Sequence, residues 1–470
     1  MKAYAPLGEA ALPLPDLRLR RRLDVLVETF AEQPQRSIPQ ATGNRNDMDA
    51  AYDFFKNPRV RPPAIVRSCL GDTLRRLQGC QRVLAIQDAS DLNFSSLEDT
   101  TGLGHTDGPG GRGLKLHSTL AVRADGLPVG LLTQQFWARD PQAQGRVKDR
   151  RRRDAQDKES FRWQDHARAA RAALPEGLTV IPIADREGDI YEWLAAPRPA
   201  QAHLLVRVAQ AHRVVVHGPD GATGCLADVV RAAVPLGRHT ITVPRSDDKP
   251  SRQAVLSLRV AAVQVQPPRH AKQRRQLRPV PVWTLEAWEE APPPGSQAVC
   301  WRLLSTEPIE TCEQALRALR EYVLRWLIER LHYTMKSGCL VEGLQLSDAE
   351  RLANAVAVYS QVAARILRLT HQLRVEPEAA ATSEFSAEEL EVLQGNRQRQ
   401  PGGRATAAVR TVAEAVAVVA RLGGHLGRKG DGPPGVKVLW RGLQSLHDQV
   451  LGYRLGQHPT LPPEPDSRNE

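Results

Sequence analysis

Two aspartates follow apolar segments and could act as a pair. Asp88 closes the sequence Leu-Ala-Ile-Gln-Asp, and Asp185 closes Ile-Pro-Ile-Ala-Asp. Side chains at strand ends in α/β folds converge on one crevice, so the two carboxylates can be neighbours although they are far apart in the chain. Taken singly, an aspartate after a strand is commonly a turn residue or a helix cap.

A third carboxylate, Glu329, lies in a segment with helical periodicity. At about 100° per residue, Tyr322, Arg325, Glu329 and Lys336 fall within roughly 60° of one another on one predicted helix. An ordinary solvated helix face produces the same charge pattern. The opposite face is apolar and consists of Leu324, Leu327, Ile328, Leu331 and Met335. A capping box, Thr311 with Gln314, is predicted to open the helix.

Three carboxylates in one pocket would repel one another unless a divalent cation were bound. Hard oxygen ligands favour Mg²⁺ or Mn²⁺. Two such ions about 4 Å apart would activate a water or a 3′-hydroxyl and stabilise the leaving oxygen in phosphodiester cleavage. The net charge of +11 predicts a polyanionic partner. Nucleic acid is the first candidate, and an anionic membrane surface is the second.

The composition limits the class of protein. A chain of 470 residues is long enough for several domains. It has no apolar run of about 18 residues and no signal-peptide core at the N-terminus, which predicts a soluble, cytoplasmic protein without a membrane segment. The six cysteines form no CxxC pair or Cys/His cluster. We therefore expect neither a disulfide framework nor a zinc site, and predict reduced, mostly buried thiols.

The first part of the chain is predicted as a helical module followed by strands. Residues 1–70 contain two helical segments, with Pro58, Pro62 and Pro63 closing the module and Tyr52, Phe54 and Phe55 mainly in its core. The helices are expected over 23–31 and 48–56. The strands are expected over 83–86, 115–122, 128–136 and 178–184. Pro182 predicts a bulge or a local edge in the last of these. The arginine run 150–153 is predicted to be a solvated loop.

The second half changes from strands to helices. Residues 195–305 are rich in Val and Pro and are predicted to be an all-β insertion. Its strands are expected over 203–208, 239–243, 254–265 and 280–285. Helices are expected over 348–369, 387–393 and 411–422, and the last two open with the capping boxes Ser386/Glu389 and Thr411/Glu414. The tail after Gln457 is predicted to be disordered.

The order Asp, Asp, Glu with Tyr322, Arg325, Glu329 and Lys336 resembles the Tyr-Arg-Glu-Lys signature of the DDE transposases encoded by bacterial insertion sequences, the cut-and-paste branch. Other blocks along nearly the whole chain are similar to the family's blocks, and their order makes the resemblance specific. They are Gln87-Asp88 before Asp91-Leu92-Asn93, residues 113–121, Lys158-Glu159-Ser160 with Trp163, residues 185–189, residues 205–208, Thr306-Glu-Pro, Arg421-Leu-Gly-Gly, Gly432-Pro-Pro-Gly and Leu439-Trp-Arg-Gly.

The resemblance implies a ribonuclease-H-like α/β catalytic core in which Asp88, Asp185 and Glu329 hold two Mg²⁺ ions, with Mn²⁺ as a substitute. It implies a helical domain at 1–70 that binds DNA ends, a catalytic domain at 71–370 interrupted by the β insertion, and a helical dimerisation domain at 371–470. Such enzymes bind terminal inverted repeats in double-stranded DNA, nick one strand, form and reopen a hairpin, and join the freed ends to target DNA. They work as homodimers in a paired-end complex and need no nucleotide cofactor.

Several residues are implied to touch DNA. Tyr322, Arg325 and Lys336 would grip the backbone beside the scissile phosphate. Trp301 matches a family tryptophan that stacks on a flipped base, although a core tryptophan on a strand would look the same. Trp326 is a second candidate for that role. The remaining candidates, which could also be plain surface charge, are Arg207, His212 and Arg213 along the DNA channel, and Arg20, Arg21, Arg22 and Arg45 at the terminal repeats.

The chain departs from the family at two positions. Tyr333 stands where the family usually has a lysine, and Met335 stands where an aromatic is usual. Two other functions remain open from the sequence: a general metal-dependent DNA nuclease, and a catalytically inactive DNA-binding dimer that inhibits transposition. His117 and His425 could suggest metal binding, but lone histidines beside apolar segments are more often structural.

Overall fold

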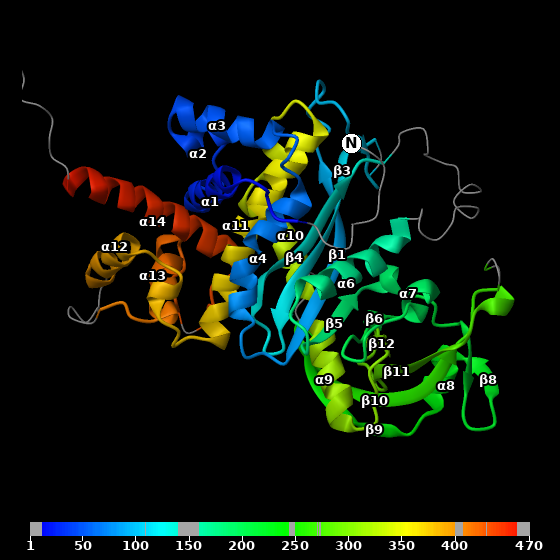
Figure 1. Ribbon diagram of the computed structural model, residues 1–470. Helices are drawn as coiled ribbons and strands as arrows, with labels where there is room; N and C mark the ends of the chain where they lie inside the picture. The colour runs from blue at the N-terminus through cyan, green and yellow to red at the C-terminus, as the bar shows by residue number, and fades with distance from the viewer. Residues whose placement is uncertain are drawn as a thin grey trace, which may run out of the picture. The chain divides into compact units, whose positions relative to one another are not determined.

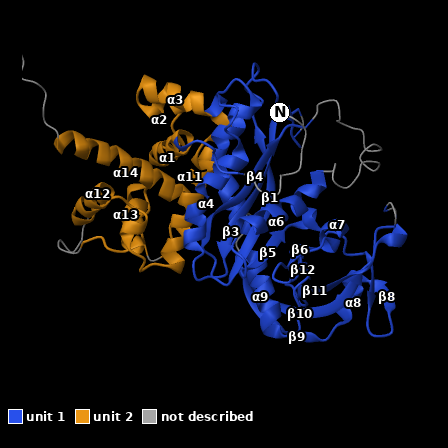
Figure 2. Cartoon of the chain, in the orientation of Figure 1, with its two compact units in different colours: residues 1–17, 55–332, 345–357 blue, residues 18–54, 333–344, 358–470 orange. Residues whose placement is uncertain are grey.

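The computed structural model describes residues 12–108, 110–139, 159–243, 250–269, 271, 274–399, 408–428 and 430–457. The arginine run 150–153 and the tail after Gln457 lie outside these residues, so the predictions for them stay untested. The chain divides into two compact units (Figure 2). Unit 1 comprises residues 1–17, 55–332 and 345–357, and unit 2 comprises 18–54, 333–344 and 358–470.

Unit 1 is built on one twelve-stranded mixed sheet among its described residues (Figure 1). The strand order is β2-β3-β1-β5-β6-β12-β11-β10-β7-β8, with β4 paired to β3 and β9 paired to β10. The strands are β1 Arg82–Asn93, β2 Gly104–His105, β3 Arg112–Arg123, β4 Pro128–Trp137, β5 Thr179–Ala184, β6 Leu205–Arg207, β7 Val214–His217, β8 Ala222–Cys225, β9 Pro235–Val243, β10 Arg252–Val265, β11 Val280–Glu289 and β12 Cys300–Ser305. The predicted α/β class is confirmed.

Strand β1 is longer than the sequence indicated, and this corrects the position of Asp88. The apolar run ends near Ile86, but β1 pairs with β3 from Val83 to Asn93, so Asp88 lies inside a strand rather than at its end. On its other side, β1 pairs with β5 only from Arg82 to Ile86. Asp88 therefore lies just beyond the end of the parallel pairing, where polar side chains are tolerated.

Of the two alternatives predicted at Pro182, the bulge is absent, because β1 and β5 keep one register through the pair Ala85 and Pro182. The local edge fits the side toward β6, where pairing begins only at Ile183. Val180 donates its N–H to Gln201 and accepts from His203, so its hydrogen-bonding groups face away from β1. Pro182, two residues on, faces the same side, where β6 begins to pair only at Ile183. The missing N–H of proline thus removes no hydrogen bond between β1 and β5.

The sequence indicated an all-β insertion over 195–305, but the structure shows that this region is not all-β. It includes helix α8 (Leu226–Ala232), which buries Leu226, Ala227 and Val230, and a short 3-10 turn. Its strands continue the sheet of β1 and β5 instead of forming a separate layer. One buried cluster joins Trp163 of α6 (Arg162–Ala173) to Trp193 of α7 (Tyr191–Ala195) and to strand residues of the insertion.

Several helices depart from the predicted pattern. Pro62 and Pro63 begin helix α4 (Pro62–Arg76) instead of closing a module, because proline lacks only an N–H that the first turn does not use. Helix α14 (Val436–Gln457) was missed, since three glycines interrupt its pattern. The other long helices are α1 Leu17–Glu32, α3 Arg45–Lys56, α9 Cys312–Val323, α10 Trp326–Tyr333, α11 Ala349–Val375, α12 Ala387–Gln398 and α13 Val412–Leu422. The capping boxes at Thr311, Ser386 and Thr411 are confirmed.

Unit 2 brings N-terminal and C-terminal helices into one core. The rings of Phe30 in α1 and Tyr359 in α11 stack with their centroids 4.5 Å apart. His447 of α14 lies 3.3 Å from the carboxylate of Glu32 at the end of α1. Residues 18–54 are thus part of the same compact unit as residues 358–470.

The cysteines and the predicted core aromatics gave mixed outcomes. All six cysteines are free thiols, as expected, but only Cys339 is buried, so the prediction of mostly buried thiols was wrong. Phe54 and Phe55 are buried as predicted, whereas Tyr52 is half-buried. Among the described helices, none is long and apolar enough to cross a membrane.

Candidate active site

The site begins with a register match between β1 and β5. Ile86 pairs with Ile183 in parallel, and Asp88 and Asp185 each follow two residues later, just beyond this pairing. Burial and, after it, the negative charge of Asp185 raise the pKa of Asp88 to about 7, although Arg325 and the N–H of Ala89 oppose this. The two aspartates are therefore close enough to repel each other, as the strand-end argument predicted.

Asp185 also has the ordinary role that the sequence left open. Its side chain caps a 3-10 turn over Arg186–Gly188 and accepts the N–H of Glu187 at 2.8 Å. Glu187 in turn forms an ion pair with Arg162 of α6. These contacts hold the loop after β5 in place and so fix the direction of the Asp185 carboxylate.

The helix predicted over 322–336 is interrupted, which corrects the single-helix interpretation. Helix α9 ends at Val323, α10 runs from Trp326 to Tyr333, and a π-helical turn follows over Thr334–Gly338. At the break, Arg325 N–H donates to Tyr322 O at 3.0 Å and Leu327 N–H donates to Leu324 O at 2.9 Å. Periodicity could not show this break, because the segment contains no glycine or proline.

Arg325 lies between two of the predicted carboxylates. Its Nη1 is 3.5 Å from Asp88 Oδ2, and its Nη2 forms an ion pair with Glu329. Tyr322 is buried, and burial raises the pKa of its hydroxyl against the positive charges of Arg325 and Arg207. The structure thus gathers Asp88, Asp185, Tyr322, Arg325 and Glu329 in unit 1, despite the helix break.

The carboxylates of the site are suitable ligands for a divalent cation, although they are not arranged around one. Within the described part of the chain, no three His, Cys, Asp or Glu side chains are grouped as a metal site. Glu329 is turned toward Arg325 instead. The carboxylates of Asp88 and Asp185 nevertheless supply only hard oxygen donors. Burial and, after it, the negative charge of Asp185 raise the pKa of Asp88, and a cation would neutralise that charge.

Two segments of the chain match known families. Residues 4–60 match the family model described as Transposase DNA-binding, and residues 361–458 match the model described as Transposase Tn5 dimerisation domain. Both models describe transposases, and together they support a Tn5-like transposase. This confirms the resemblance inferred from the sequence blocks. It indicates a DNA transposase that binds DNA and carries a dimerisation domain, and the second match spans α12, α13 and α14.

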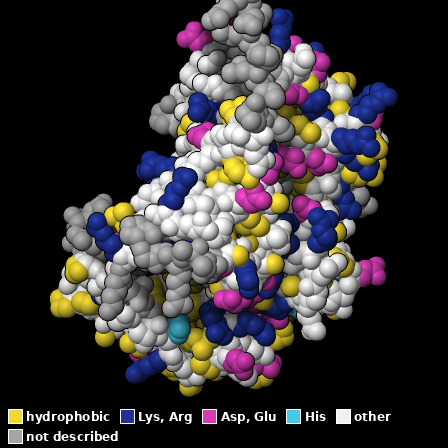
Figure 3. All heavy atoms as spheres, turned by 90° about the vertical axis from the view of Figure 1, so that its left-hand side faces the viewer, with side chains coloured by type: hydrophobic (Ala, Val, Ile, Leu, Met, Phe, Trp, Pro, Cys, Tyr) yellow, Lys and Arg dark blue, Asp and Glu magenta, His cyan; other side chains and the backbone are white. Residues whose placement is uncertain are grey.

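The predicted DNA-end contacts of the transposase lie in the matched N-terminal segment. Arg20, Arg21 and Arg45 are exposed. Arg22 lies 3.4 Å from Asp47, and Arg45 lies 3.7 Å from Asp49. On the face drawn in Figure 3, basic side chains are mixed with acidic ones instead of forming one continuous field. The net charge is therefore not concentrated on that face.

The other predicted DNA contacts differ in their surroundings. Trp326 is 57% exposed at the start of α10, whereas Trp301 is half-buried on β12. Arg207 is half-buried and His212 is exposed. Arg213 pairs with Asp189, which is fully buried and also accepts the N–H groups of Ala209 and Gln210. Arg213 is therefore held by a buried ion pair, which a charge count could not show, and its predicted DNA contact stays a prediction.

Lys336 and Tyr333 belong to unit 2 of the transposase. Lys336 lies in the π-helical turn, 3.9 Å from Glu342. Tyr333 is 39% exposed, and its ring lies 5.9 Å from the ring of Trp440. Met335, which stands where an aromatic is usual, is fully buried.

Sequence reasoning missed two attachments of the site. Arg82, at the start of β1, binds Glu307 and Glu321, so it joins the strand of Asp88 to helix α9. His332, on α10, contacts Ser118 of β3. Arg82 lies shortly before, and His332 lies within, a sequence block that resembles the family's blocks. Nothing local in the sequence showed which residues they would contact.

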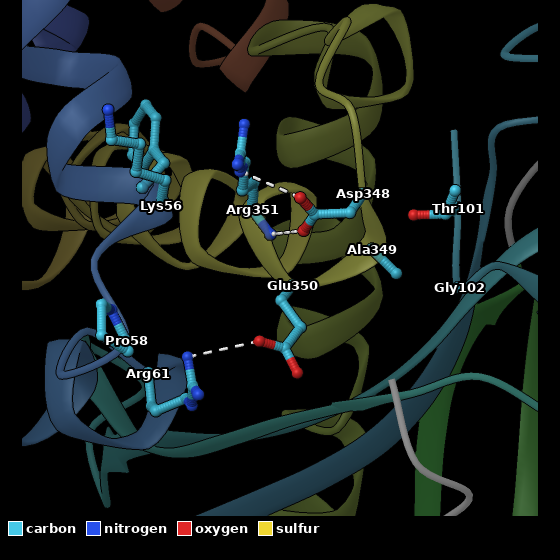
Figure 4. Close-up of a pocket in the computed structure, with 10 residues that line it drawn as sticks. Lys56, Pro58, Arg61, Thr101, Gly102, Asp348, Ala349, Glu350 and Arg351 are labelled. Atoms are coloured by element: carbon cyan, nitrogen blue, oxygen red, sulfur yellow. Dashed lines mark hydrogen bonds and ion pairs between the residues drawn. The ribbon is translucent and has the colours of Figure 1, made fainter. Parts of the chain in front are cut away.

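A cavity of about 290 Å³ in unit 1 contains none of the predicted catalytic residues (Figure 4). Arg61 and Arg351 line it, and they pair with Glu350 at 3.4 Å and with Asp348 at 2.9 Å. Because these cations are matched by carboxylates, the cavity is not an evident anion site.

Proposed function

We propose that this transposase cuts and joins DNA at Asp88, Asp185 and Glu329 in a ribonuclease-H-like core. The proposal is supported chiefly by the register of β1 and β5, which sets Asp88 beside Asp185. The ion pairs of Arg325 with Asp88 and Glu329 connect the third carboxylate to the pair. The DNA-binding match supplies the substrate class.

The three carboxylates would hold two Mg²⁺ or Mn²⁺ ions. When bound, such ions polarise the scissile phosphate and lower the pKa of the attacking water or hydroxyl. To take part, Glu329 must turn away from Arg325, and Asp88 must be ionised. The released guanidinium of Arg325 is then available to a backbone phosphate of DNA, and the buried Tyr322 hydroxyl lies beside it.

The proposed reaction has two kinds of step. In the first, a water oxygen attacks the phosphorus at the transposon end, and the leaving 3′-oxygen takes up a proton to give a free 3′-hydroxyl. In the second, that hydroxyl attacks the phosphodiester of the opposite strand at the transposon end, which forms a hairpin and releases the flanking DNA with a 3′-hydroxyl. Hydrolysis reopens the hairpin, and the 3′-hydroxyl then attacks target DNA. Trp301 or Trp326 would stack on a base displaced by the hairpin bend.

The dimerisation match supports a homodimer that holds two transposon ends in a paired-end complex. Each joining step exchanges one phosphodiester for another, so no nucleotide cofactor is needed to supply energy.

The test is excision of a DNA segment flanked by the inverted repeats that border the gene. Purified transposase with Mg²⁺ should release the segment. Glu329→Gln should abolish release while keeping the affinity for repeat DNA within about twofold. Glu192→Gln is the matched control, because Glu192 is an exposed carboxylate on α7.

Two results would overturn the proposal. Cutting that ignores the repeats would indicate a general metal-dependent nuclease. Repeat binding without any nick by the unaltered chain would indicate a catalytically inactive inhibitor of transposition.

A further inference from the structure

One row of side chains crosses the sheet beside Asp88. In the antiparallel register, Asp88 of β1 faces Ser118 of β3, and Ser118 faces Gln134 of β4. Residues directly opposite in antiparallel strands project from the same face of a sheet. Ser118 therefore places its hydroxyl on the face that carries the Asp88 carboxylate.

Helix α10 reaches this row through His332. The Nε2 atom of His332 lies 3.3 Å from Ser118 Oγ, and Gln134 Nε2 donates to the same oxygen at 3.2 Å. Ser118 and Gln134 are fully buried, and His332 is 6% exposed. This buried contact is thus shielded from water, where a hydrogen bond is most costly to break.

His332 and Glu329 belong to the same side of α10. They are three residues apart, so their side chains are neighbours on the helix surface. Arg325 connects this side of the helix to Asp88, and His332 connects it to Ser118, the residue opposite Asp88. This side of α10 is therefore connected to two neighbouring residues of the sheet, Asp88 and Ser118.

The helix break separates α10 from α9, so α10 depends on its own contacts with the sheet. Arg82 fastens α9 to β1 through Glu321, but the tight turn at Leu324 and Arg325 separates α9 from α10. Helix α10 has only 8 residues, so its orientation depends on its own tertiary contacts, which are its buried residues Leu327, Ile328 and Leu331 and the contact of His332. An attachment of its own is needed to hold Glu329.

The opposite face of the same strands provides a contrast. His166 of α6 contacts Thr133 Oγ1 at 2.7 Å, and His117 contacts Gln87 Oε1 at 3.1 Å. Strand alternation places Gln87, His117 and Thr133 on the face away from Asp88 and Ser118. These two histidines have structural surroundings, as the sequence favoured for His117, and neither of these contacts involves α10.

We propose that His332 is a positioning residue that, through Ser118, holds Glu329 opposite Asp88 for metal binding and strand cleavage. This rests on the proposed catalytic role of the three carboxylates. If Glu329 were less constrained, metal binding would have to order its side chain. This entropic cost would make metal bind more weakly. Residues that orient metal ligands typically change metal affinity by about 10–100-fold when altered.

The test compares His332→Leu with His332→Gln. Glutamine keeps a nitrogen near the position of Nε2 and should stay within about threefold of the unaltered transposase, whereas leucine removes the contact. With His332→Leu, we expect the Mg²⁺ concentration for half-maximal cleavage to rise about 10-fold or more. DNA affinity should change by less than about twofold. Titration of Mn²⁺ into the protein–DNA complex should show the same loss.

Ser118→Ala provides a second route, including when His332→Leu fails to fold. It should weaken Mn²⁺ binding in the same direction, and the double variant should be no weaker than His332→Leu, because both changes break one contact. His166→Gln is the control on the opposite face and should leave the Mn²⁺ affinity unchanged.

Specific outcomes overturn the proposal. These are unchanged Mn²⁺ affinity in both His332→Leu and Ser118→Ala, effects of the two changes that multiply, no rescue by glutamine, or an equal loss in His166→Gln. Failure of the unaltered transposase to cleave would overturn the proposed function instead, and the Mn²⁺ titration would still decide the role of His332.

Discussion

Arg82 binds Glu321 through two donors, with Nε at 2.7 Å and Nη2 at 2.9 Å from the carboxylate oxygens. The same guanidinium also binds Glu307, at 2.9 and 2.6 Å. Arg82 begins the strand that contains Asp88, and Glu321 immediately precedes Tyr322. This cluster therefore joins the two segments that carry most of the proposed site.

The Arg82 cluster should contribute strongly to stability. Arg82→Met leaves the buried Glu321 carboxylate without this cation, whereas Glu307 keeps Arg317 at 3.3 Å, so the free energy of unfolding should fall by about 3–5 kcal/mol. Urea denaturation of the purified protein measures this. The matched control is Arg75→Met, whose partner Asp72 is 58% exposed. That change should cost less than about 1 kcal/mol. Equal losses of unfolding free energy in the two variants would show that the Arg82 cluster contributes no more to stability than an exposed ion pair.

Arg325 should compete with metal for the carboxylates. In Arg325→Gln, Asp88 and Glu329 lose the cation between them, so the metal-free protein should melt at a lower temperature. Saturating Mn²⁺ should then raise the melting temperature more than it does in the unaltered protein, because ligand binding stabilises the folded state. Arg320→Gln, an exposed position on α9, is the control. An identical Mn²⁺ shift in all three proteins would contradict this competition.

The buried histidine His166 should make stability depend on pH. Burial and the charge of Arg162 lower the pKa of His166 to about 3. The unfolded chain takes up this proton below about pH 6.5, whereas the folded chain does not, so the histidine favours unfolding as the pH falls from about 6.5 toward 3. Its contribution to stability is fully present above pH 6.5.

The variant His166→Gln isolates this effect. Between pH 7 and pH 5, the unaltered transposase should lose about 2 kcal/mol more unfolding free energy than His166→Gln does. Denaturant titrations at the two pH values measure the difference. Parallel losses in both proteins would mean that His166 takes up a proton in the folded state.

The arginines of the DNA-binding segment should determine the salt dependence of repeat binding. Each phosphate contact that is lost should reduce the slope of log affinity against log salt concentration by about 0.9. We expect this change for Arg21→Gln and for Arg45→Gln, since both side chains are exposed. Arg75→Gln, which lies outside residues 4–60, should leave the slope unaltered. A reduced affinity with an unchanged slope would instead indicate contacts to bases.

The sequence alone predicted the parts of this protein that depend on local chemistry. Capping boxes, apolar periodicity and strand-like runs depend on neighbouring residues, so the helices opened by Ser386 and Thr411 and the strand before Asp185 were predicted correctly. The ordered blocks also indicated the family, which the matches at both ends of the chain confirmed.

Only the tertiary structure decided how distant segments meet. The length of β1 depends on its pairing with β3, and the break before Trp326 depends on packing that periodicity does not contain. The same holds for the partners of Arg213 and His332. Arg213 pairs with Asp189, and His332 contacts Ser118. Neither partner is a sequence neighbour. Local preferences set which elements form, but burial and long-range pairing determine which charges are neutralised and which remain for chemistry.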